Sequence, residues 1–540
     1  MATLDWFIFV LFFFGLAGIV IWVLKNKKED TSDYFLAGRD AGWIAVGASI
    51  FAANIGSEHL VGLAGAGAQS GMAMAHWEMQ GWMILILGWL FVPFYEHSKV
   101  FTMPEFLEKR FNSGSRSFLS VITLISYVLT KVSVTAFTGG IFLKTVLGID
   151  SMWGVDFFWI AAVGLVLLTG VFTVLGGMKG IMKISVVQTP ILIIGSIIIL
   201  ILGLNKVGGW DEVMKACGNN IHLMRPATDP KFPWTGVILG AAIIGFWYWC
   251  TDQHIVQRVL SARNQTQARK GTIFAAYLKV LPVFMFLIPG MIAFALKKKG
   301  LLNMPDPNEA FPLLVSTLLP VGIKGIVIVG FLCALMSSLA AHFNSSATLF
   351  TIDFFKIYHP EASEKKLVVV GRLATGAVVL LGLVWIPIMR SLGAVLYEYL
   401  QNVQSLIAPA IAAVFLMGVF NKKITPKAGH WALIAGFCIG MFRLLLMIFK
   451  GQFSETSLFG QFLAVNWLHF CIFLFFFCIV LMVVVSYFTP KPTAEQLVGL
   501  TYTSTTEEQK ASTRKSWNKW DVIHSLVVIG IIVIFYIYFW

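Results

Sequence analysis

The feature that most constrains this chain is a series of apolar runs, each near the roughly 20 residues that a helix needs to cross a bilayer. The runs lie at 5–24, 42–70, 77–98, 117–147, 157–175, 180–203, 235–257, 270–296, 312–355, 366–388, 397–418, 428–450, 464–487 and 519–539. Hydrophobic residues make up 58% of the 540 residues, far more than a soluble core requires. The pattern predicts an all-α multi-pass membrane protein with about fourteen transmembrane helices.

The short loops between these runs carry most of the basic residues. Asp5 stands where a cleaved signal peptide would have a basic start, so the first run is expected to stay as a helix. With the N-terminus outside, the basic loops at 25–28, 109–110, 258–270 and 422–427 fall inside, as the positive-inside rule requires. Only Lys297, Lys298 and Lys299 break the rule. We therefore expect a cell-membrane protein, inner or plasma membrane, with both termini outside.

Several functional classes are excluded. The net charge of +13 is spread over alternating loops, which indicates lipid-bilayer orientation and no nucleic-acid partner. The six cysteines are scattered without a disulfide framework or zinc spacing. Motifs for ATP or substrate hydrolysis are missing, so no enzymatic activity is predicted and transport energy must come from elsewhere.

Two runs contain polar interruptions, which lie at mid-membrane depth only where they line a cavity or bind something. The second run is interrupted at 52–59, and the seventh at 245–253, where an interfacial aromatic belt is the alternative interpretation. Counted from the second run, the interruptions fall on helices one and six of two inverted five-helix halves. The predicted division is 1–41 (extra helix and loop), 42–204 (first half), 205–234 (outer loop), 235–420 (second half) and 421–540 (further helices, with a polar linker near 488–518).

Ionisable residues in these runs are costly unless they have a function or a partner. Glu58 and His59 follow the first interruption, Glu78 begins the next run, and Lys279 lies within the eighth. Together with Gln401 and Tyr248 they provide the carboxylate, amide, ammonium and aromatic groups that bind a polyol. Taken singly, each also has a structural interpretation, such as a satisfied core histidine or a neutralised carboxylate.

The ninth run is rich in small hydroxylated residues. Ala334 and Ser338 share a helical face with Ser337 adjacent, and carbonyls freed at 52–55 supply further oxygens. Hard cations such as sodium prefer oxygen ligands, so these groups predict an ion site without formal charge. Ordinary packing between membrane helices is the alternative.

These residues resemble the sodium:solute symporter family, and within it the sodium/glucose cotransporters. The resemblance covers most of residues 30 to 420 and rests on AANIGS at 52–57, VGLAG at 61–65, GWLFVP at 88–93, TMPEF at 102–106, WYWCTDQ at 247–253, IVQR at 255–258, YLK at 277–279, LMSSL at 335–339 and FTID at 350–353. It implies the leucine-transporter fold with a 5+5 inverted repeat.

The resemblance also implies residue roles. Sugar contacts would be Asn54, His59, Glu78, Tyr248, Trp249, Lys279 and Gln401. The gates would be Leu63, Trp77 and Tyr397 outside and Tyr248 inside. The sodium ligands would be the carbonyls of Ala52, Ile55 and Ala334 and the hydroxyls of Ser337 and Ser338. His59 stands where animal glucose carriers also have histidine, which favours a glucose- or galactose-like hexose.

Two departures from the family pattern bear on stoichiometry and specificity. Ser185 stands in place of a family aspartate that helps define a second sodium site, which argues for one sodium per sugar. Gln404 replaces a pocket threonine of the animal carriers, so their hexose preference does not transfer intact.

The predicted function is sodium-coupled import of a monosaccharide by alternating access, with Na⁺ as the co-transported ion. A same-family symporter for inositol, sialic acid, proline or an organic anion is the main alternative. A solute sensor or channel is a weaker one.

Overall fold

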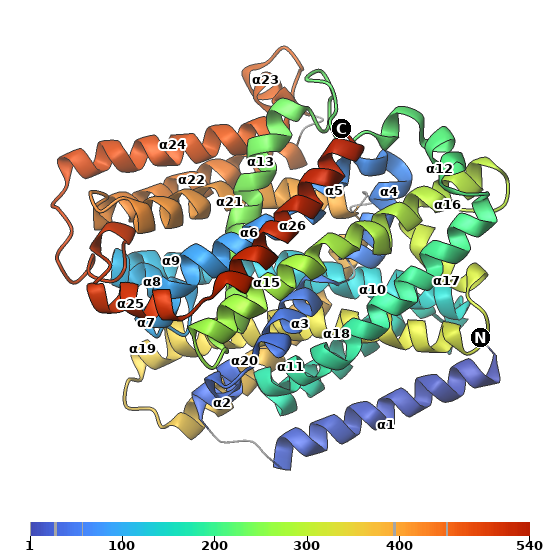
Figure 1. Ribbon diagram of the computed structural model, residues 1–540, viewed down its shortest axis with the longest axis horizontal. Coiled ribbons are helices and arrows are strands. Elements are labelled where there is room, and N and C mark those ends of the chain that lie inside the picture. Colours follow the sequence, from blue (N-terminus) through green and yellow to red (C-terminus); the bar gives the residue numbers. More distant parts are fainter. Residues whose placement is uncertain (1, 26–29, 57, 392–395, 450–451) are drawn as a thin grey trace.

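The computed structural model describes residues 2–25, 30–56, 58–391, 396–449 and 452–540. Within these segments the side chains at 16, 19, 20, 23, 24, 129, 388–391 and 396–399 stand outside the description. The chain forms a bundle of long helices, with α1 (Thr3–Lys25) along one edge (Figure 1). The described part is helical apart from one short hairpin, β1 (Ser151–Met152) with β2 (Val155–Asp156).

After α1, one element of the predicted segment 1–41 and those of the predicted first half come next along the chain. They are α2 (Thr31–Leu36), α3 (Trp43–Asn54), η2 (Glu58–Leu63), α4 (Ala64–Ser70), α5 (Ala75–Glu78), α6 (Gly81–Ile86), η4 (Leu87–Phe91), α7 (Val92–Ser98), α8 (Met103–Arg110), α9 (Ser113–Ser126), η5 (Tyr127–Val132), α10 (Ser133–Leu147) and α11 (Phe157–Val207). The elements η2, η4 and η5 are single π-helical turns, a feature frequent at functional sites.

Elements of the second half and the C-terminal region follow. They are α12 (Trp210–Cys217), α13 (Trp234–Phe246), η7 (Trp247–Thr251), α14 (Gln253–Leu260), α15 (Gln265–Pro282), η8 (Val283–Leu287), α16 (Ile288–Lys298), α17 (Ala310–Leu318), α18 (Ile323–Phe350), η10 (Thr351–Phe355), α19 (Lys356–Tyr358), α20 (Glu364–Ser391), α21 (Leu396–Phe420), α22 (Pro426–Ile448), α23 (Leu458–Ala464), α24 (Trp467–Phe488), α25 (Glu507–Lys515) and α26 (Lys519–Tyr538).

In the described part of the chain, eleven helices are long and apolar enough to cross a membrane. The runs expected at 157–175 and 180–203 are joined in α11, where Gly177 with φ of 52° interrupts the helix. The run expected at 312–355 is divided, because a turn separates α17 from α18. The second run is split by its polar interruption: Trp43–Asn54 is too short to count, and the part from Glu58 onward is counted together with the third run as Glu58–Ser98. The total of fourteen therefore stays a prediction.

Close helix crossings hold the bundle together. A methyl group on Gly290 would lie 2.0 Å from Ala64 O, and one on Gly67 would lie 2.3 Å from Leu287 O. Only glycine allows α4 to approach η8 and α16 so closely, as is usual where membrane helices pack. On another face of the bundle, α26 crosses over α15 (Figure 1).

The lysines that broke the positive-inside rule are bonded at the end of α16. Lys299 Nζ lies 2.6 Å from Glu212 Oε2 and donates to Val207 O over 2.8 Å. Lys298 Nζ donates to Ala216 O over 3.2 Å. Hydrogen bonds from Lys299 and Lys215 lower the pKa of Glu212 to about 2. Of the three lysines, Lys299 thus has a carboxylate partner in Glu212.

The linker near 488–518 is not simply a solvated connection. Gln496 Nε2 donates to Phe111 O over 2.8 Å, and Arg269 donates to Ser516 Oγ. Within it, α25 begins with a capping box formed by Thr506 and Gln509. These contacts attach the linker to α8 and α15.

Candidate substrate and ion sites

The first interruption ends α3 at Asn54. Ile55 is extended, with φ of −77° and ψ of 99°, and its N–H still bonds to Phe51 O. The carbonyls that follow Phe51 in the last turn of α3 have no helical donor, because a helix leaves its final carbonyls unsatisfied. The chain becomes helical again at Glu58 in η2. Ser57 lies outside the described residues. The predicted helix break is confirmed, and it exposes carbonyl oxygens deep inside the protein.

The second interruption separates η7 from α14. Asp252 is extended, with φ of −77° and ψ of 131°, and its carboxylate caps α14 by accepting from His254 N. Tyr95 OH donates to Cys250 O over 2.7 Å, which satisfies a carbonyl freed by the break. Both predicted interruptions are thus present, one in each half of the chain.

A buried polar cluster joins the two interrupted segments. Lys279 Nζ lies 2.5 Å from Glu78 Oε2 and 3.1 Å from Asn54 Oδ1. Asn54 Nδ2 donates to Tyr248 OH over 3.1 Å, and His59 Nε2 lies 3.4 Å from Glu78 Oε2. All five side chains are at most 8% exposed. Residues predicted from separate runs therefore form one connected set.

Two aromatic rings complete one wall of this cluster. Tyr248 and Trp249 meet edge to face with centroids 5.0 Å apart, and Lys279 Nζ lies 5.2 Å from the Trp249 ring centroid. Trp249 Nε1 donates over 3.1 Å to Gln80 Oε1, and Gln80 Nε2 donates over 2.8 Å to Ala241 O. Gln80, which the sequence did not single out, fixes the plane of the indole.

These side chains surround a cavity of about 320 Å³, including its mouth. It is lined by Asn54, Glu58, His59, Trp77, Gln80, Ile244, Gly245, Tyr248, Trp249, Lys279, Gln401 and Gln404. Gln401 Oε1 and Trp77 Nε1 are buried without a hydrogen-bond partner among the described residues. An unsatisfied acceptor and an unsatisfied donor in one small cavity suit a ligand that both donates and accepts.

A second ion pair borders the same cavity. Lys131 Nζ in η5 lies 2.9 Å from Glu58 Oε1, and both side chains are buried. The same ammonium lies 5.0 Å from the centroid of the Tyr248 ring. Each of the adjacent rings, Tyr248 and Trp249, thus has a carboxylate-bound ammonium over it. Lys131 was missed by sequence reasoning, although a lysine inside an apolar run is itself a signal.

The cavity is covered on one side by aromatic residues. Trp77 stacks on Trp467 of α24 with centroids 5.6 Å apart and an angle of 16°, and Phe232 meets both rings edge to face. Leu63 is fully buried at the end of η2. Tyr397, the third residue of the predicted outer gate, has a side chain outside the description. Trp467 and Phe232 were not predicted.

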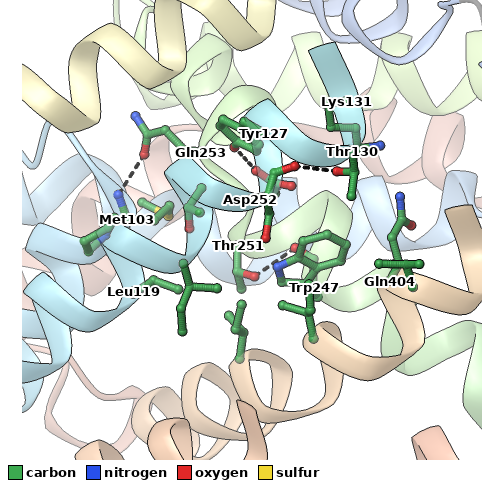
Figure 2. A pocket seen from close by; sticks show the side chains of 17 residues that line it. Met103, Leu119, Tyr127, Thr130, Lys131, Trp247, Thr251, Asp252, Gln253 and Gln404 are labelled. Atoms are coloured by element: carbon green, nitrogen blue, oxygen red, sulfur yellow. Dashed lines mark hydrogen bonds between the residues drawn. The ribbon is translucent and has the colours of Figure 1, made fainter. Parts of the chain in front are cut away.

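Figure 2 shows a second cavity, lined by residues of α9, η5, η7 and α21. Thr130, Lys131, Trp247, Asp252 and Gln404 are among the residues that line it. Gln404 borders both cavities. The second cavity therefore adjoins the solute cavity at Gln404.

The predicted ion ligands lie on two segments that contact each other. Ala52, Ile55 and Ala334 are fully buried, and Ser337 and Ser338 are nearly so. A methyl group on Gly56 would lie 2.6 Å from Ser338 Oγ, so the interrupted segment touches α18 at this serine. The contact joins carbonyls of one segment to hydroxyls of the other, which is the oxygen chemistry that suits sodium.

Two residues of α11 adjoin this region. Ser337 Oγ donates to Gln188 Oε1 over 2.6 Å. Ser185 Oγ donates to Ile181 O of its own helix over 2.8 Å, so this position offers a hydroxyl and no carboxylate.

Comparison with known proteins identifies the family. Residues 34–436 match the sodium:solute symporter family. The human sodium/myo-inositol cotransporter 2 is 36% identical over 92% of this chain and 78% of its own length. The rabbit (Oryctolagus cuniculus) sodium/glucose cotransporter 1 is 36% identical over 90% of this chain and 79% of its own length. Such relatives are transporters, not enzymes, as predicted.

Solved structures confirm the fold class. A Na⁺-coupled sialic acid symporter in a substrate-bound outward-open state superposes with a TM-score of 0.73 at 19% identity, over 91% of this chain and 99% of that one. Mhp1, a nucleobase-cation-symport-1 family transporter, gives 0.52 at 14% identity, over 88% and 98%. Both have the leucine-transporter fold that the sequence predicted. The chain belongs to the sodium:solute symporter family and is a multi-pass membrane transporter that couples a small solute to sodium.

Proposed function

We propose that the transported solute is a monosaccharide, a glucose- or galactose-like hexose, bound in the cavity between the two interrupted segments. The proposed contacts are Asn54, His59, Glu78, Tyr248, Trp249, Lys279 and Gln401; all but Glu78 line the cavity, and Glu78 is bonded to Lys279. The observation that carries the proposal is the unsatisfied pair Gln401 Oε1 and Trp77 Nε1 beside the Lys279–Glu78 bond. A sugar hydroxyl both donates and accepts, so it satisfies both atoms, whereas a carboxylate only accepts.

The charge of the cavity supports a neutral ligand. Lys279 is bonded to Glu78 and Lys131 to Glu58, so each buried ammonium already has a carboxylate partner. An anionic solute such as sialic acid would need an ammonium or guanidinium of its own inside this low-dielectric site. The Trp249 and Tyr248 rings offer faces to the apolar C–H surface of a hexose.

A second candidate is myo-inositol, another neutral polyol with the same hydroxyl chemistry. The relatives support it as well as a hexose, since a sodium/myo-inositol cotransporter and a sodium/glucose cotransporter are equally identical to this chain. Gln404 at the border of both cavities adds an amide that distinguishes polyols by hydroxyl position.

The proposed sodium ligands are the carbonyls of Ala52, Ile55 and Ala334 with the Ser337 and Ser338 hydroxyls. Sodium here would hold the interrupted segment against α18 and complete the adjoining solute cavity. Rocking of the helix bundle against its scaffold then exposes the sites alternately, with Leu63, Trp77 and Tyr397 closing one side and Tyr248 the other.

One sodium per sugar is supported by Ser185, which places no carboxylate beside α18. One charge moving through 100 mV yields about 2.3 kcal/mol, and a tenfold sodium gradient adds about 1.4 kcal/mol. One ion thus sustains a solute ratio of roughly a few hundred, and two would square it. The limiting accumulation ratio at a known potential therefore measures the stoichiometry.

Both termini are proposed to lie outside at the cell membrane. Asp5 of α1 bonds to Gly322 N over 2.8 Å, and Leu223 N donates to Phe539 O over 2.6 Å. Each terminus therefore contacts a loop that the positive-inside rule also places outside. An epitope at either end, labelled in intact cells, tests this orientation.

The decisive experiment is uptake of labelled D-glucose, D-galactose and myo-inositol into proteoliposomes under an inward sodium gradient, with a potassium gradient as control. Accumulation of a hexose that Ser338→Ala abolishes supports both the solute and the ion site. Accumulation of myo-inositol alone replaces the hexose by the second candidate. Failure of all three overturns the polyol proposal, and other solutes are then screened on the same scaffold.

A further inference from the structure

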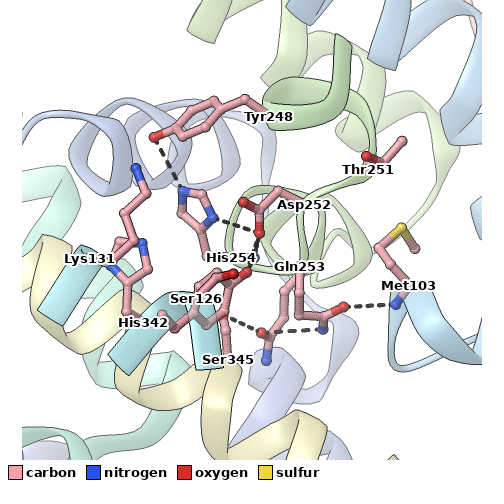
Figure 3. A network of polar contacts seen from close by, with 12 residues as sticks. Met103, Ser126, Lys131, Tyr248, Thr251, Asp252, Gln253, His254, His342 and Ser345 are labelled. Carbon is pink, nitrogen blue, oxygen red and sulfur yellow. Dashed lines mark hydrogen bonds and ion pairs between the residues drawn. The ribbon is translucent and has the colours of Figure 1, made fainter. Parts of the chain in front are cut away.

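Two buried histidines stack between the proposed ion site and the proposed inner gate. The rings of His254 in α14 and His342 in α18 lie 4.6 Å apart at an angle of 29° (Figure 3). Tyr127 meets both rings edge to face, at 5.9 Å and 5.2 Å. Neither histidine lines the solute cavity, so solute binding does not explain why two imidazoles are buried here.

His342 is attached to the proposed ion site. Its Nδ1 lies 2.8 Å from Ser338 O, and because a carbonyl only accepts, this nitrogen carries the proton. The hydroxyl of the same serine is the one that touches Gly56 of the interrupted segment. A movement of this turn of α18 on ion binding therefore moves the His342 ring.

His254 is attached to the proposed gate. Its Nδ1 lies 3.0 Å from Asp252 Oδ1, and a carboxylate accepts, so Nδ1 carries the proton and Nε2 is left as an acceptor. Tyr248 OH lies 3.3 Å from that Nε2 and donates to it. Tyr127 also donates to the same Asp252 oxygen, which fixes the carboxylate.

The hydrogen bonds then run in one direction from the solute cluster. Lys279 donates to Asn54, Asn54 donates to Tyr248, and Tyr248 donates to His254, whose Nδ1 forms an ion-pair contact with Asp252. Asn54, Tyr248 and His254 each contact one partner on either side, so none of the three turns without breaking a contact on each side. Tyr248 is thus held by His254 on one side and by the solute cluster on the other.

We propose that the stacked pair His254 and His342 is a relay that couples sodium binding at Ser338 to the position of Tyr248. Sodium orders the Ser338 turn, His342 holds its stack on His254, and His254 keeps the Tyr248 hydroxyl across the inner side of the solute cavity. Both histidines are positioning residues that touch neither ion nor solute. The inference rests on the proposed sodium site and the proposed gate.

The relay is tested first without any solute. A reporter cysteine, Thr123→Cys in the second cavity, is introduced together with Cys438→Ser, which removes the exposed native cysteine. Maleimide labelling of the reporter is compared in sodium and potassium. Sodium is expected to slow labelling in the parent protein, because it holds the inner side closed. His342→Phe and His254→Phe keep a ring of similar size and are expected to lose this protection.

The control is His430→Phe on α22, a half-buried histidine away from the relay, which keeps full protection. Binding of ²²Na⁺ shows that each variant is folded. If either histidine variant keeps the parent's protection, the relay is overturned. If a higher sodium concentration restores protection in His342→Phe, that residue merely supports the ion site and the relay is equally overturned.

The second readout is the gain in affinity that saturating sodium gives to labelled D-glucose, D-galactose or myo-inositol. Coupling between two sites is typically a 5- to 150-fold effect, and we expect each single variant to lose at least fivefold of the gain. The double variant should lose no more than either single one, because both interrupt one path. Additive losses overturn the relay. If none of the three solutes binds to the parent, the polyol proposal fails, while the labelling result still decides the relay.

Discussion

The ammonium of Lys131 lies 2.9 Å from Glu58 Oε1, and this buried ion pair joins π-turn η5 to the segment that begins after the first helix break. The two residues are 73 positions apart and come from different helices. The contact therefore joins η2, which contributes to the solute cavity, to η5.

Removing one member of that pair should leave the other charge buried without compensation. We expect Glu58→Leu or Lys131→Met alone to lower the free energy of unfolding by about 3–5 kcal/mol, and the double variant to recover most of the loss. Thermal unfolding in detergent measures both effects. Lys99→Met, which breaks an exposed pair with Glu96, is the control and should change stability by less than about 1 kcal/mol. Equal stability of all four variants would contradict this assignment.

Glu78 should matter for solute affinity more than for sodium affinity. Glu78→Gln weakens the bond to Lys279, which lines the solute cavity, and so disturbs the position of that ammonium. A hydrogen bond to a charged group contributes about 1.5–3 kcal/mol, so we expect solute affinity at saturating sodium to fall roughly tenfold to a hundredfold. Equilibrium binding of labelled solute measures the loss, with the half-exposed Glu96→Gln as control. A fall in sodium affinity measured without solute would argue against this division of roles.

Gly56 should be required for sodium binding. A methyl group there would lie 2.6 Å from Ser338 Oγ, so Gly56→Ala must push the interrupted segment away from α18. We expect the sodium concentration for half-maximal transport to rise at least tenfold, read from sodium-activation curves. Gly164→Ala in α11 adds the same methyl group where no atom lies within 4 Å and should leave the curve unchanged. Identical curves for both variants would remove Gly56 from the ion site.

Trp467 should slow solute escape on the side that Trp77 covers. Their rings stack at 5.6 Å, and an aromatic pair contributes about 0.5–1.5 kcal/mol beyond burial. Trp467→Ala is therefore expected to speed dissociation of bound solute by a few-fold to about tenfold, measured by isotope chase. The exposed Trp431 of α22 provides the control, since Trp431→Ala removes an indole that covers no part of the cavity. Unchanged dissociation in Trp467→Ala would assign the covering role to other residues.

Asp5 should stabilise the start of α18 from outside that helix. Its Oδ1 accepts from Gly322 N over 2.8 Å and from Gly325 N over 3.0 Å, so a residue of α1 caps α18. Loss of a cap costs about 0.5–2 kcal/mol. Asp5→Leu should lower the unfolding midpoint, whereas Asp5→Asn retains an acceptor and should lower it less. If the two variants have the same unfolding midpoint, the cap makes no measurable contribution to stability.

The sequence by itself determined the all-helical membrane architecture and the positions of both helix breaks. The length of an apolar run is a local property that decides whether a helix can cross the bilayer. The Asn and Gly residues at 52–59 and the change from aromatic to polar residues at 245–253 disfavour a continuous helix in any surroundings. The polar cluster was also anticipated, because an ionisable side chain in an apolar run requires a partner or a function. The sequence did not predict that α17 and α18 are separate helices or that two runs join in α11. The turn between α17 and α18 and the kink in α11 depend on how the helices pack.

Which partner each of these side chains takes was decided only by the tertiary structure. The sequence around Glu58 does not predict its ion pair with Lys131. The sequence around His254 does not predict its ring contacts with His342 and Tyr127. Asn54 and Tyr248, 194 positions apart, bond only because the two interrupted segments cross. The free-energy cost of burying an ionisable side chain depends on the residue type alone. The ion pair or hydrogen bond that offsets this cost depends on which helices pack together and at what depth.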